Sequence, residues 1–291
     1  MVPIARAAAV NGAPMRTRII PATGEALPVV GCGTWRTFDV AAEPAARAPL
    51  AAVLGELFAA GGSVIDTSPM YGAAEAVVGD LLAEAGTRSR AFLATKVWTT
   101  GRNAGVVQMR RSFERLRTDR IDLMQVHNLV DWRTHLATLE AWKAEGRVRH
   151  VGLTHYTPSA HDELEAAMRA ARVDFVQLNY AADDRAAEAR LLPVAAERGI
   201  AVLVNQPFGG GGLLRRLRGR PLPGWAAEID CKSWAQVLLK FVLAHPAVTC
   251  VIPGTSRPEH MRDNAAAGTA GADGRWLLPD AEMRRRIADS L

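Results

Sequence analysis

Four polar side chains of different chemical types lie at or just beyond the ends of short apolar runs. Asp66, Lys96 and His127 each end such a run, 30 residues (66 to 96) and 31 residues (96 to 127) apart. Tyr71 lies in the loop just beyond Asp66. Because the carboxyl ends of parallel strands meet at one face of a barrel, we expect these four side chains to converge in one cavity.

A carboxylate, a phenol, an ammonium and an imidazole together suit the reduction of a carbonyl group. A phenol is normally too weak an acid to protonate a carbonyl oxygen at neutral pH, but an ammonium beside Tyr71 would stabilise the phenolate. Asp66 provides the counter-charge that Lys96 needs in a cleft. A neutral His127 can hydrogen-bond the carbonyl oxygen and orient it. None of the four can donate a hydride, so the chemistry requires a cofactor.

The elements that must position these residues follow a regular rhythm. Eight mostly continuous apolar runs alternate with helical patterns, as expected for parallel strands covered on both faces. This rhythm predicts an α/β fold, a (β/α)8 TIM barrel, whereas a doubly wound open sheet would usually show a glycine-rich turn after its first strand. Residues 15–31, with Gly24 in a turn, are expected to form a short hairpin that closes the barrel floor. The expected strands are residues 28–33, 63–66, 91–96, 121–127, 148–153, 174–179, 200–205 and 248–253.

Composition limits the classes of partner. The 291 residues carry 35 basic and 30 acidic side chains, a formal net charge of +5, and the charges are interspersed, which argues against nucleic-acid binding. No apolar run reaches about 18 residues, so no membrane span is expected. Three cysteines without metal-ligand spacing argue against structural zinc and a disulfide framework, and indicate a reducing, cytoplasmic setting.

Two domain assignments follow from the same pattern. We expect residues 15–291 to form a single domain. Residues 1–14 are rich in alanine and loosely patterned, which predicts a flexible arm or the remnant of an export signal. Export to the periplasm would require a twin-arginine signal upstream of these residues.

Two loops offer a place for a cofactor that carries phosphate. After the seventh expected strand come Asn205, Gln206, Pro207 and Phe208, and then the glycine run 209–212, beginning with Gly209 and Gly210. After the eighth come Gly254, Thr255, Ser256 and Arg257, ahead of a helix. Phosphate sites of barrels are commonly built from these two loops and a helix N-terminus. The glycine run permits close approach of the backbone and a mobile flap, although a plain flexible loop would look the same.

At this point the residues resemble the aldo-keto reductases, from about Arg16 to the C-terminus. The stretch "DTSPMYGAAEAVVG", residues 66–79, is similar to the DTAxxYGxExxxG signature of that family, and "ATK" and "IDLMQVH" resemble its other two catalytic strands. The resemblance implies NAD(P)H-dependent, reversible reduction of aldehyde and ketone carbonyls by hydride transfer. It implies a catalytic tetrad of Asp66, Tyr71, Lys96 and His127, with Tyr71 as the proton donor.

The resemblance also implies which residues hold the nicotinamide. Thr154 and His155 would hold its carboxamide, and Gln177 would bond the same amide. Asn205 stands where the family often stacks a tyrosine on the ring, which suggests weaker stacking or another residue in that role.

The segment for the adenosine phosphate departs further from the family pattern. Gly254 and His260 stand where family members place a lysine and an arginine against the 2′-phosphate, while Asp263 and Asn264 keep their register. Arg257 could supply the missing cation. NADPH is therefore favoured, and NADH stays open as a cofactor.

The expected substrate is a small carbonyl compound, and the chain is expected to be a monomer or a weak homo-oligomer. Trp35, Met70, Trp98 and Asn128 each follow an expected strand and are assigned to the substrate pocket, although one or two could merely pack on the barrel top. The histidines outside the candidate site, His135, His150, His161 and His245, are expected on the surface or at helix ends.

One other function stays open, and a second is set aside. A barrel of this kind could be a regulatory module that binds a nicotinamide cofactor with little turnover, as potassium-channel β-subunits do, but no partner surface is evident in the sequence. A metal-dependent hydrolase would need clusters of His and Asp at the strand ends. The sequence offers one such histidine, with Lys96 nearby, so no metal is expected.

Overall fold

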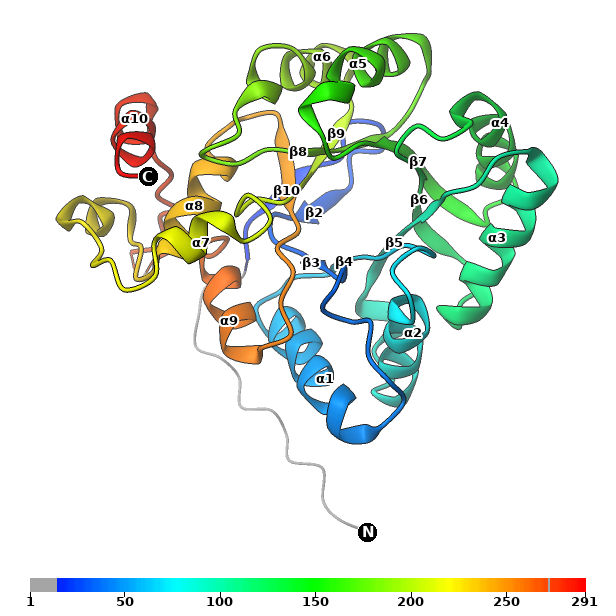
Figure 1. The fold of residues 1–291 in the computed structure, drawn as a ribbon, viewed down its shortest axis with the longest axis horizontal. Helices are drawn as coiled ribbons and strands as arrows, with labels where there is room; N and C mark the ends of the chain where they lie inside the picture. The colour runs from blue at the N-terminus through cyan, green and yellow to red at the C-terminus, as the bar shows by residue number, and fades with distance from the viewer. Residues whose placement is uncertain (1–14, 272) are drawn as a thin grey trace.

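Parallel strands form the centre of the computed structural model, which describes residues 15–271 and 273–291 (Figure 1). Bridges from Val30 to Val251 and from Gly33 to Gly254 join the first strand segment to the last, and the described strands thus form the predicted (β/α)8 barrel. In chain order the barrel strands are β3 (Cys32–Gly33), β4 (Val64–Asp66), β5 (Phe92–Val97), β6 (Ile121–His127), β7 (Val148–Thr154), β8 (Phe175–Asn179), β9 (Ala201–Asn205) and β10 (Val248–Val251).

The register of these strands brings the polar residues to one end. Asp66 pairs with Ala94 at the end of β4, and His127 pairs with Thr154 at the end of β6 and β7. Nearly every residue of the barrel strands is buried, because helices cover the outside and side chains fill the inside. The polar side chains at the strand ends therefore face a common cavity.

Helices surround the barrel, and their ends match local sequence signals. Pro44 and Pro258 each occupy the first turn of a helix, where the missing N–H costs no hydrogen bond. Gly199 ends α6 with a φ of 64°, a left-handed conformation that glycine adopts readily. The surrounding helices are α1 (Pro44–Ala59), α2 (Ala74–Glu84), α3 (Arg102–Arg115), α4 (Trp132–Ala144), α5 (His161–Ala170), α6 (Leu191–Arg198), α8 (Trp234–Leu243) and α9 (Pro258–Ala266).

The glycine run after β9 leads into a short helix. Gly209, Gly210 and Gly211 have φ values of 56°, 60° and 85°, so the chain needs glycine there, and α7 (Gly212–Arg216) follows. The C-terminal α10 (Ala281–Asp289) lies at the edge of the molecule, away from the barrel strands (Figure 1). Four 3₁₀ turns complete the described elements: η1 (Arg88–Arg90), η2 (Pro158–Ala160), η3 (Ala186–Glu188) and η4 (Gly224–Ile229).

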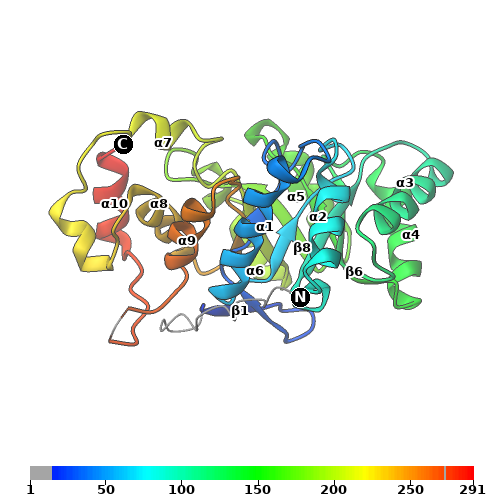
Figure 2. The same cartoon turned by 90° about the horizontal axis from the view of Figure 1, so that it is seen from below.

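The predicted hairpin closes the barrel floor. Strands β1 (Thr17–Ile19) and β2 (Ala26–Pro28) pair antiparallel. They lie at the end of the barrel opposite to α7 (Figure 2). Ile20 and Leu27 are buried in the same cluster as the apolar side chains inside the barrel. The inside of the barrel is therefore plugged at this end.

Three of the histidines expected on the surface or at helix ends are buried. His135 is fully buried and its Nε2 lies 2.7 Å from the carbonyl oxygen of Thr99, and His161 is also buried. His150 is 1% exposed and its ring stacks against Phe92, which lies inside the barrel. For His150 the expectation was wrong, because alternate positions along β7 point into the barrel whatever the side chain. His135 and His161 lie in the first turns of α4 and α5, at helix ends as expected.

Two sequence-based assignments stay predictions. The arm predicted at residues 1–14 lies outside the described residues, and the assignment of residues 15–291 to a single domain stays a prediction.

Within the part of the chain that the structure covers, none of the helices combines the length and the apolar character needed to cross a membrane.

Candidate active site

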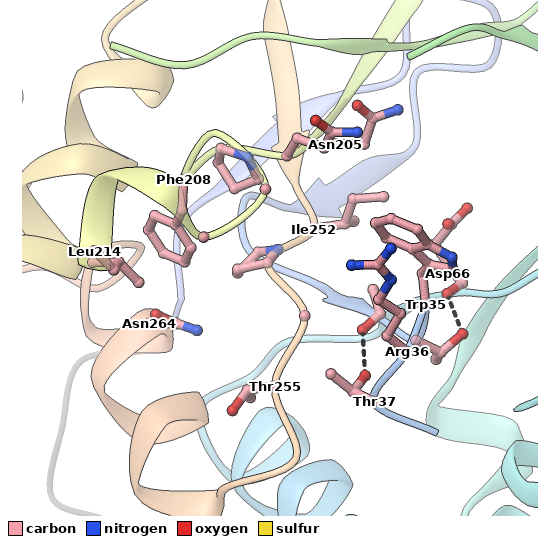
Figure 3. Close-up of a pocket in the computed structure, with 18 of the residues that line it drawn as sticks. Trp35, Arg36, Thr37, Asp66, Asn205, Phe208, Leu214, Ile252, Thr255 and Asn264 are labelled. Carbon is pink, nitrogen blue, oxygen red and sulfur yellow. Dashed lines mark hydrogen bonds between the residues drawn. The ribbon is translucent and has the colours of Figure 1, made fainter. Parts of the chain in front are cut away.

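A cavity of about 1240 Å³ opens at the carboxyl ends of the barrel strands. It runs as a groove from the loops after β3 and β4 to the space between α7 and α9. In Figure 3, Phe208 and Leu214 on the α7 side face Asn264 and Thr255 on the α9 side, and Trp35 lies at the other end. Asp66 lies at the inner end of this groove (Figure 3).

Lys96 and Asp66 form a buried ion pair at this inner end. The Lys96 Nζ donates to Asp66 Oδ2 at 2.7 Å and to the carbonyl oxygen of Thr67 at 2.7 Å. Lys96 is 0% and Asp66 2% exposed. Burial lowers the pKa of Lys96, but the charge of Asp66, with Tyr71 as a further partner, outweighs burial and raises that pKa above its usual value. Lys96 therefore carries its charge at neutral pH.

The second oxygen of Asp66 binds two buried amides. Asp66 Oδ1 accepts from Gln177 Nε2 at 2.8 Å and from Gln125 Nε2 at 3.2 Å. Since both oxygens of the carboxylate are occupied by donors, its position is fixed. Gln125 was not among the predicted site residues. It lies in the apolar run of β6, and nothing in its spacing distinguishes it from an ordinary buried polar residue.

Tyr71 lies beside this ion pair. The Nζ of Lys96 is 5.0 Å from the centroid of the Tyr71 ring, and the ring of His127 meets the Tyr71 ring edge-on at 5.9 Å. Burial raises the pKa of Tyr71, while the charge of Lys96 acts in the opposite direction and Asp66 adds to the rise. The pKa of Tyr71 stays above its ordinary value, so the phenol keeps its proton at neutral pH.

Glycine after Tyr71 has a local structural reason. Gly72 has a φ of 59°, and a Cβ there would lie 2.2 Å from a carboxylate oxygen of Asp39. Asp39 Oδ1 in turn accepts from the backbone N–H of Ala73 at 2.9 Å, directly before α2. The Tyr-Gly pair thus lets the loop turn tightly against Asp39 and aims the phenol at the cavity.

His127 is buried and uncharged. Burial first, and then the charge of Lys96 and the proximity of His155, lower the pKa of His127 to about 2. Its Nδ1 lies 3.2 Å from the Oγ of Ser68, which follows β4. The imidazole lines the cavity and is neutral over the whole physiological pH range.

A group of amides lies beside the ion pair, where the resemblance assigned the nicotinamide. Gln177 Oε1 accepts from Thr154 Oγ1 and from Asn205 Nδ2, both at 3.5 Å. Asn205 Oδ1 is buried without a hydrogen-bond partner among the described residues, although Asn205 lines the cavity. His155 does not line the cavity: its Nδ1 accepts from the backbone N–H groups of Tyr156 at 3.0 Å and of Thr157 at 3.3 Å.

Most of the other predicted cofactor residues line the groove. Gly209 and Ser256 do not line it. Arg257 reaches the groove but forms an ion pair with Glu259 at 2.6 Å, and this partner neutralises part of its charge. The residues that do line it are Gln206, Pro207, Phe208, Gly210, Gly254, Thr255, Arg257, His260, Asp263 and Asn264.

All four predicted substrate residues lie at the mouth of the cavity. Trp35, Met70 and Trp98 are exposed, and Asn128 has a buried Oδ1 that bonds no described residue. The backbone of Trp98 is held on both sides by one side chain, since Gln108 accepts from its N–H at 2.6 Å and donates to its carbonyl at 3.1 Å. The mouth is therefore apolar and partly rigid.

Several lining residues were missed by sequence reasoning. Arg36 lies over the Trp35 ring, with its guanidinium carbon 4.1 Å from the ring centroid, and Arg218 follows α7. Neither forms an ion pair with a carboxylate in the part of the chain that the structure covers. Tyr156 is a further exposed aromatic at the mouth. Arg36 directly follows Trp35, a residue assigned to the pocket, and this adjacency was the available signal.

Fold and site together define an oxidoreductase barrel that works with a nicotinamide cofactor. The sequence profile described as the Aldo/keto reductase family matches residues 29–272. The chain belongs to this family, as its resemblance to the signature predicted.

Individual relatives agree with this assignment. The chain is 31% identical over 260 residues to the methylglyoxal reductase YeaE of Escherichia coli, with 87% of this chain and 89% of the relative covered. It is 24% identical over 286 residues to the NADH-specific methylglyoxal reductase of E. coli, with 79% and 84% covered. The crystal structure of an aldo-keto reductase from Klebsiella pneumoniae in complex with NADPH superposes with a TM-score of 0.78, at 27% identity and with 95% of each chain covered.

Proposed function

We propose that this protein reduces aldehyde or ketone carbonyls to alcohols with NADPH, reversibly, and that Tyr71 donates the proton to the carbonyl oxygen. The observation that carries the proposal is the buried Lys96–Asp66 pair, 2.7 Å between Nζ and Oδ2, set beside Tyr71 at the inner end of the cavity. An ion pair is costly to bury, so its presence at this place calls for a chemical role.

The charges around Tyr71 suit a general acid. Its raised pKa keeps the phenol protonated, so that a proton is available at the hydroxyl. The ammonium of Lys96 favours the phenolate that is left after the proton moves to the substrate oxygen. Asp66 holds Lys96 in place, and the neutral His127 donates a hydrogen bond to the carbonyl oxygen and orients it.

The amide group beside the ion pair fits a nicotinamide carboxamide. A carboxamide carries donors and an acceptor, and the buried Asn205 Oδ1 is an acceptor without a partner among the described residues. Gln177 Oε1 is a second acceptor, held in place because the amide nitrogen is committed to Asp66. When bound, the cofactor supplies the hydride. Thr154, Gln177 and Asn205 would hold its carboxamide.

The groove fits the phosphates of a dinucleotide. Arg36 and Arg218 line it and have no carboxylate partner within the described residues, so their charges are available to an anionic ligand. The NADPH of the K. pneumoniae structure supports NADPH as the cofactor, and the NADH-specific E. coli relative supports NADH as a second one. Thr255, His260 and Asn264 line the end of the groove where a 2′-phosphate would bind.

The mouth suits small carbonyl compounds with an apolar part. Trp35, Met70 and Trp98 surround the entrance, with Asn128 as a polar contact. The similarity to a methylglyoxal reductase makes methylglyoxal, together with an aryl aldehyde, the first substrate to test.

The decisive test replaces the proposed acid. Tyr71→Phe keeps the ring and removes the hydroxyl, and we expect kcat for 4-nitrobenzaldehyde to fall roughly 10²- to 10⁴-fold, the usual contribution of a general acid. The affinity for NADPH, followed by tryptophan fluorescence, should change little. Tyr180→Phe is the matched control, because it removes a phenol hydroxyl that bonds Glu188 and does not line the cavity.

Two outcomes would overturn the proposal. A Tyr71→Phe protein that still reduces the aldehyde at the wild-type rate would exclude Tyr71 as the acid. A wild-type protein that binds NADPH but turns over neither methylglyoxal nor the aryl aldehyde would favour a regulatory module that holds the cofactor.

A further inference from the structure

Ser68 and His127 make a buried contact that the proposed reaction has not yet used. Ser68 is 0% exposed and its Oγ lies 3.2 Å from His127 Nδ1. The same Oγ accepts from the backbone N–H of Met70 at 3.4 Å. The signature that residues 66–79 resemble has alanine at this position, where this chain has a serine.

A neutral imidazole carries one N–H, and the contact can be made in two ways. In the first, the Ser68 hydroxyl donates to a bare Nδ1 and the N–H lies on Nε2. In the second, Nδ1–H donates to Ser68 Oγ, and the Ser68 hydroxyl hydrogen must find another acceptor. The structure offers Ser68 Oγ no other acceptor within residues 15–271 and 273–291. The second arrangement would thus leave a buried O–H unpaired, which is unfavourable.

The first arrangement gives the Ser68 hydroxyl both an acceptor and a donor. The Ser68 hydroxyl donates to Nδ1, its oxygen accepts from Met70, and His127 presents an N–H on Nε2. An N–H is what a carbonyl oxygen needs, because that oxygen only accepts hydrogen bonds. In the other tautomer Nε2 would present a lone pair to the carbonyl oxygen and repel it.

We infer that Ser68 is a positioning residue that fixes His127 in the tautomer with the proton on Nε2, and so makes His127 a hydrogen-bond donor to the substrate carbonyl. The inference rests on the proposed function for its catalytic consequence. The tautomer itself is a property of the free protein and is measured without substrate.

Nitrogen-15 NMR of histidine-labelled protein tests the tautomer directly. The signals of His127 are identified as those missing from His127→Gln. In the wild type we expect Nδ1 to show the shift of a bare ring nitrogen and Nε2 that of a protonated one. In Ser68→Ala the two shifts should move toward each other as both tautomers become populated, and Ser68→Thr, which restores a hydroxyl, should return them to the wild-type values.

Kinetics then tests the catalytic consequence. Losing one neutral hydrogen bond should lower kcat/KM for 4-nitrobenzaldehyde roughly 5-fold in Ser68→Ala, with NADPH affinity unchanged and with recovery in Ser68→Thr. Thr138→Val is the matched control, because Thr138 Oγ1 on α4 is another buried hydroxyl and pairs with no described group. Its removal should alter neither the His127 signals nor the rate.

The outcomes separate this inference from the proposed function. Wild-type signals with the proton on Nδ1, or signals unchanged in Ser68→Ala, would overturn the role of Ser68 whatever the protein catalyses. The expected NMR shifts in a protein that reduces no carbonyl would uphold the tautomer and refute the proposed function. If Ser68→Ala does not fold, the wild-type spectrum can still overturn the inference, because a proton on Nδ1 is incompatible with it.

Discussion

The neutral His127 should make folding sensitive to mild acid. Its pKa in the folded state is held at about 2, mainly by burial, whereas an unperturbed histidine has a pKa of 6.5. Between these two values the unfolded chain binds a proton at this residue and the folded chain does not. Stability contributed by the neutral imidazole is therefore complete above the unfolded pKa and is lost as the pH falls below it.

The size of the effect follows from the two pKa values. Lowering the pH from about 7 to about 5 should cost about 2 kcal/mol of unfolding free energy through His127 alone. His127→Gln removes this titration, so the variant should lose about 2 kcal/mol less than the wild type over the same interval. Urea-induced unfolding at the two pH values, followed by tryptophan fluorescence, gives both differences.

The comparison isolates one histidine, because the other six are present in both proteins. His127→Gln is expected to be less active and is used only for stability. If the wild type and the variant lose the same free energy between the two pH values, His127 is not held neutral by its surroundings. The claim that it acts as an uncharged donor would then fail.

Three further changes test the packing and the buried charges. Gly79→Ala on α2 should lower the free energy of unfolding by about 3 kcal/mol. The alanine Cβ would lie 2.1 Å from the Arg115 carbonyl oxygen, and such overpacking is costly. Gly55→Ala, on an exposed and open position of α1, should instead raise it by about 0.5–1 kcal/mol. Lys96→Met should lower it by about 3–5 kcal/mol, since Asp66 is left buried without its cation. Urea-induced unfolding measures all three free energies. The contacts described would be contradicted if Gly79→Ala were as stable as Gly55→Ala, or if Lys96→Met were as stable as the wild type.

Much of the fold could be predicted because its signals are local. Continuous apolar runs predict buried parallel strands, and all eight expected runs contain or overlap a barrel strand. Gly24 has a φ of 75°, a conformation that glycine adopts readily. The glycine therefore marked the turn of the hairpin that closes the barrel floor. Asp66, Lys96 and His127 could be assigned to one site because strand ends in a barrel share one face.

The remainder depends on tertiary contacts that no local pattern encodes. Gln125 lies in an apolar strand, and its bond to Asp66 arises only when β4 and β6 are packed in the barrel. His150 is buried inside the barrel although its sequence neighbours are ordinary. His155 follows Thr154 directly, yet its ring turns to the following loop because two backbone N–H groups bind it there.

The two oxygens of the Asp66 carboxylate have different partners: Oδ2 accepts from Lys96, and Oδ1 accepts from Gln177 and Gln125. In the proposed function Lys96 stabilises the phenolate of Tyr71, and Gln177 binds the carboxamide of the nicotinamide. A substitution at residue 66 would therefore impair both proton transfer and binding of the nicotinamide. A low rate in such a variant could not be assigned to either effect alone. Replacing each partner separately, with residue 66 intact, is the way to apportion them.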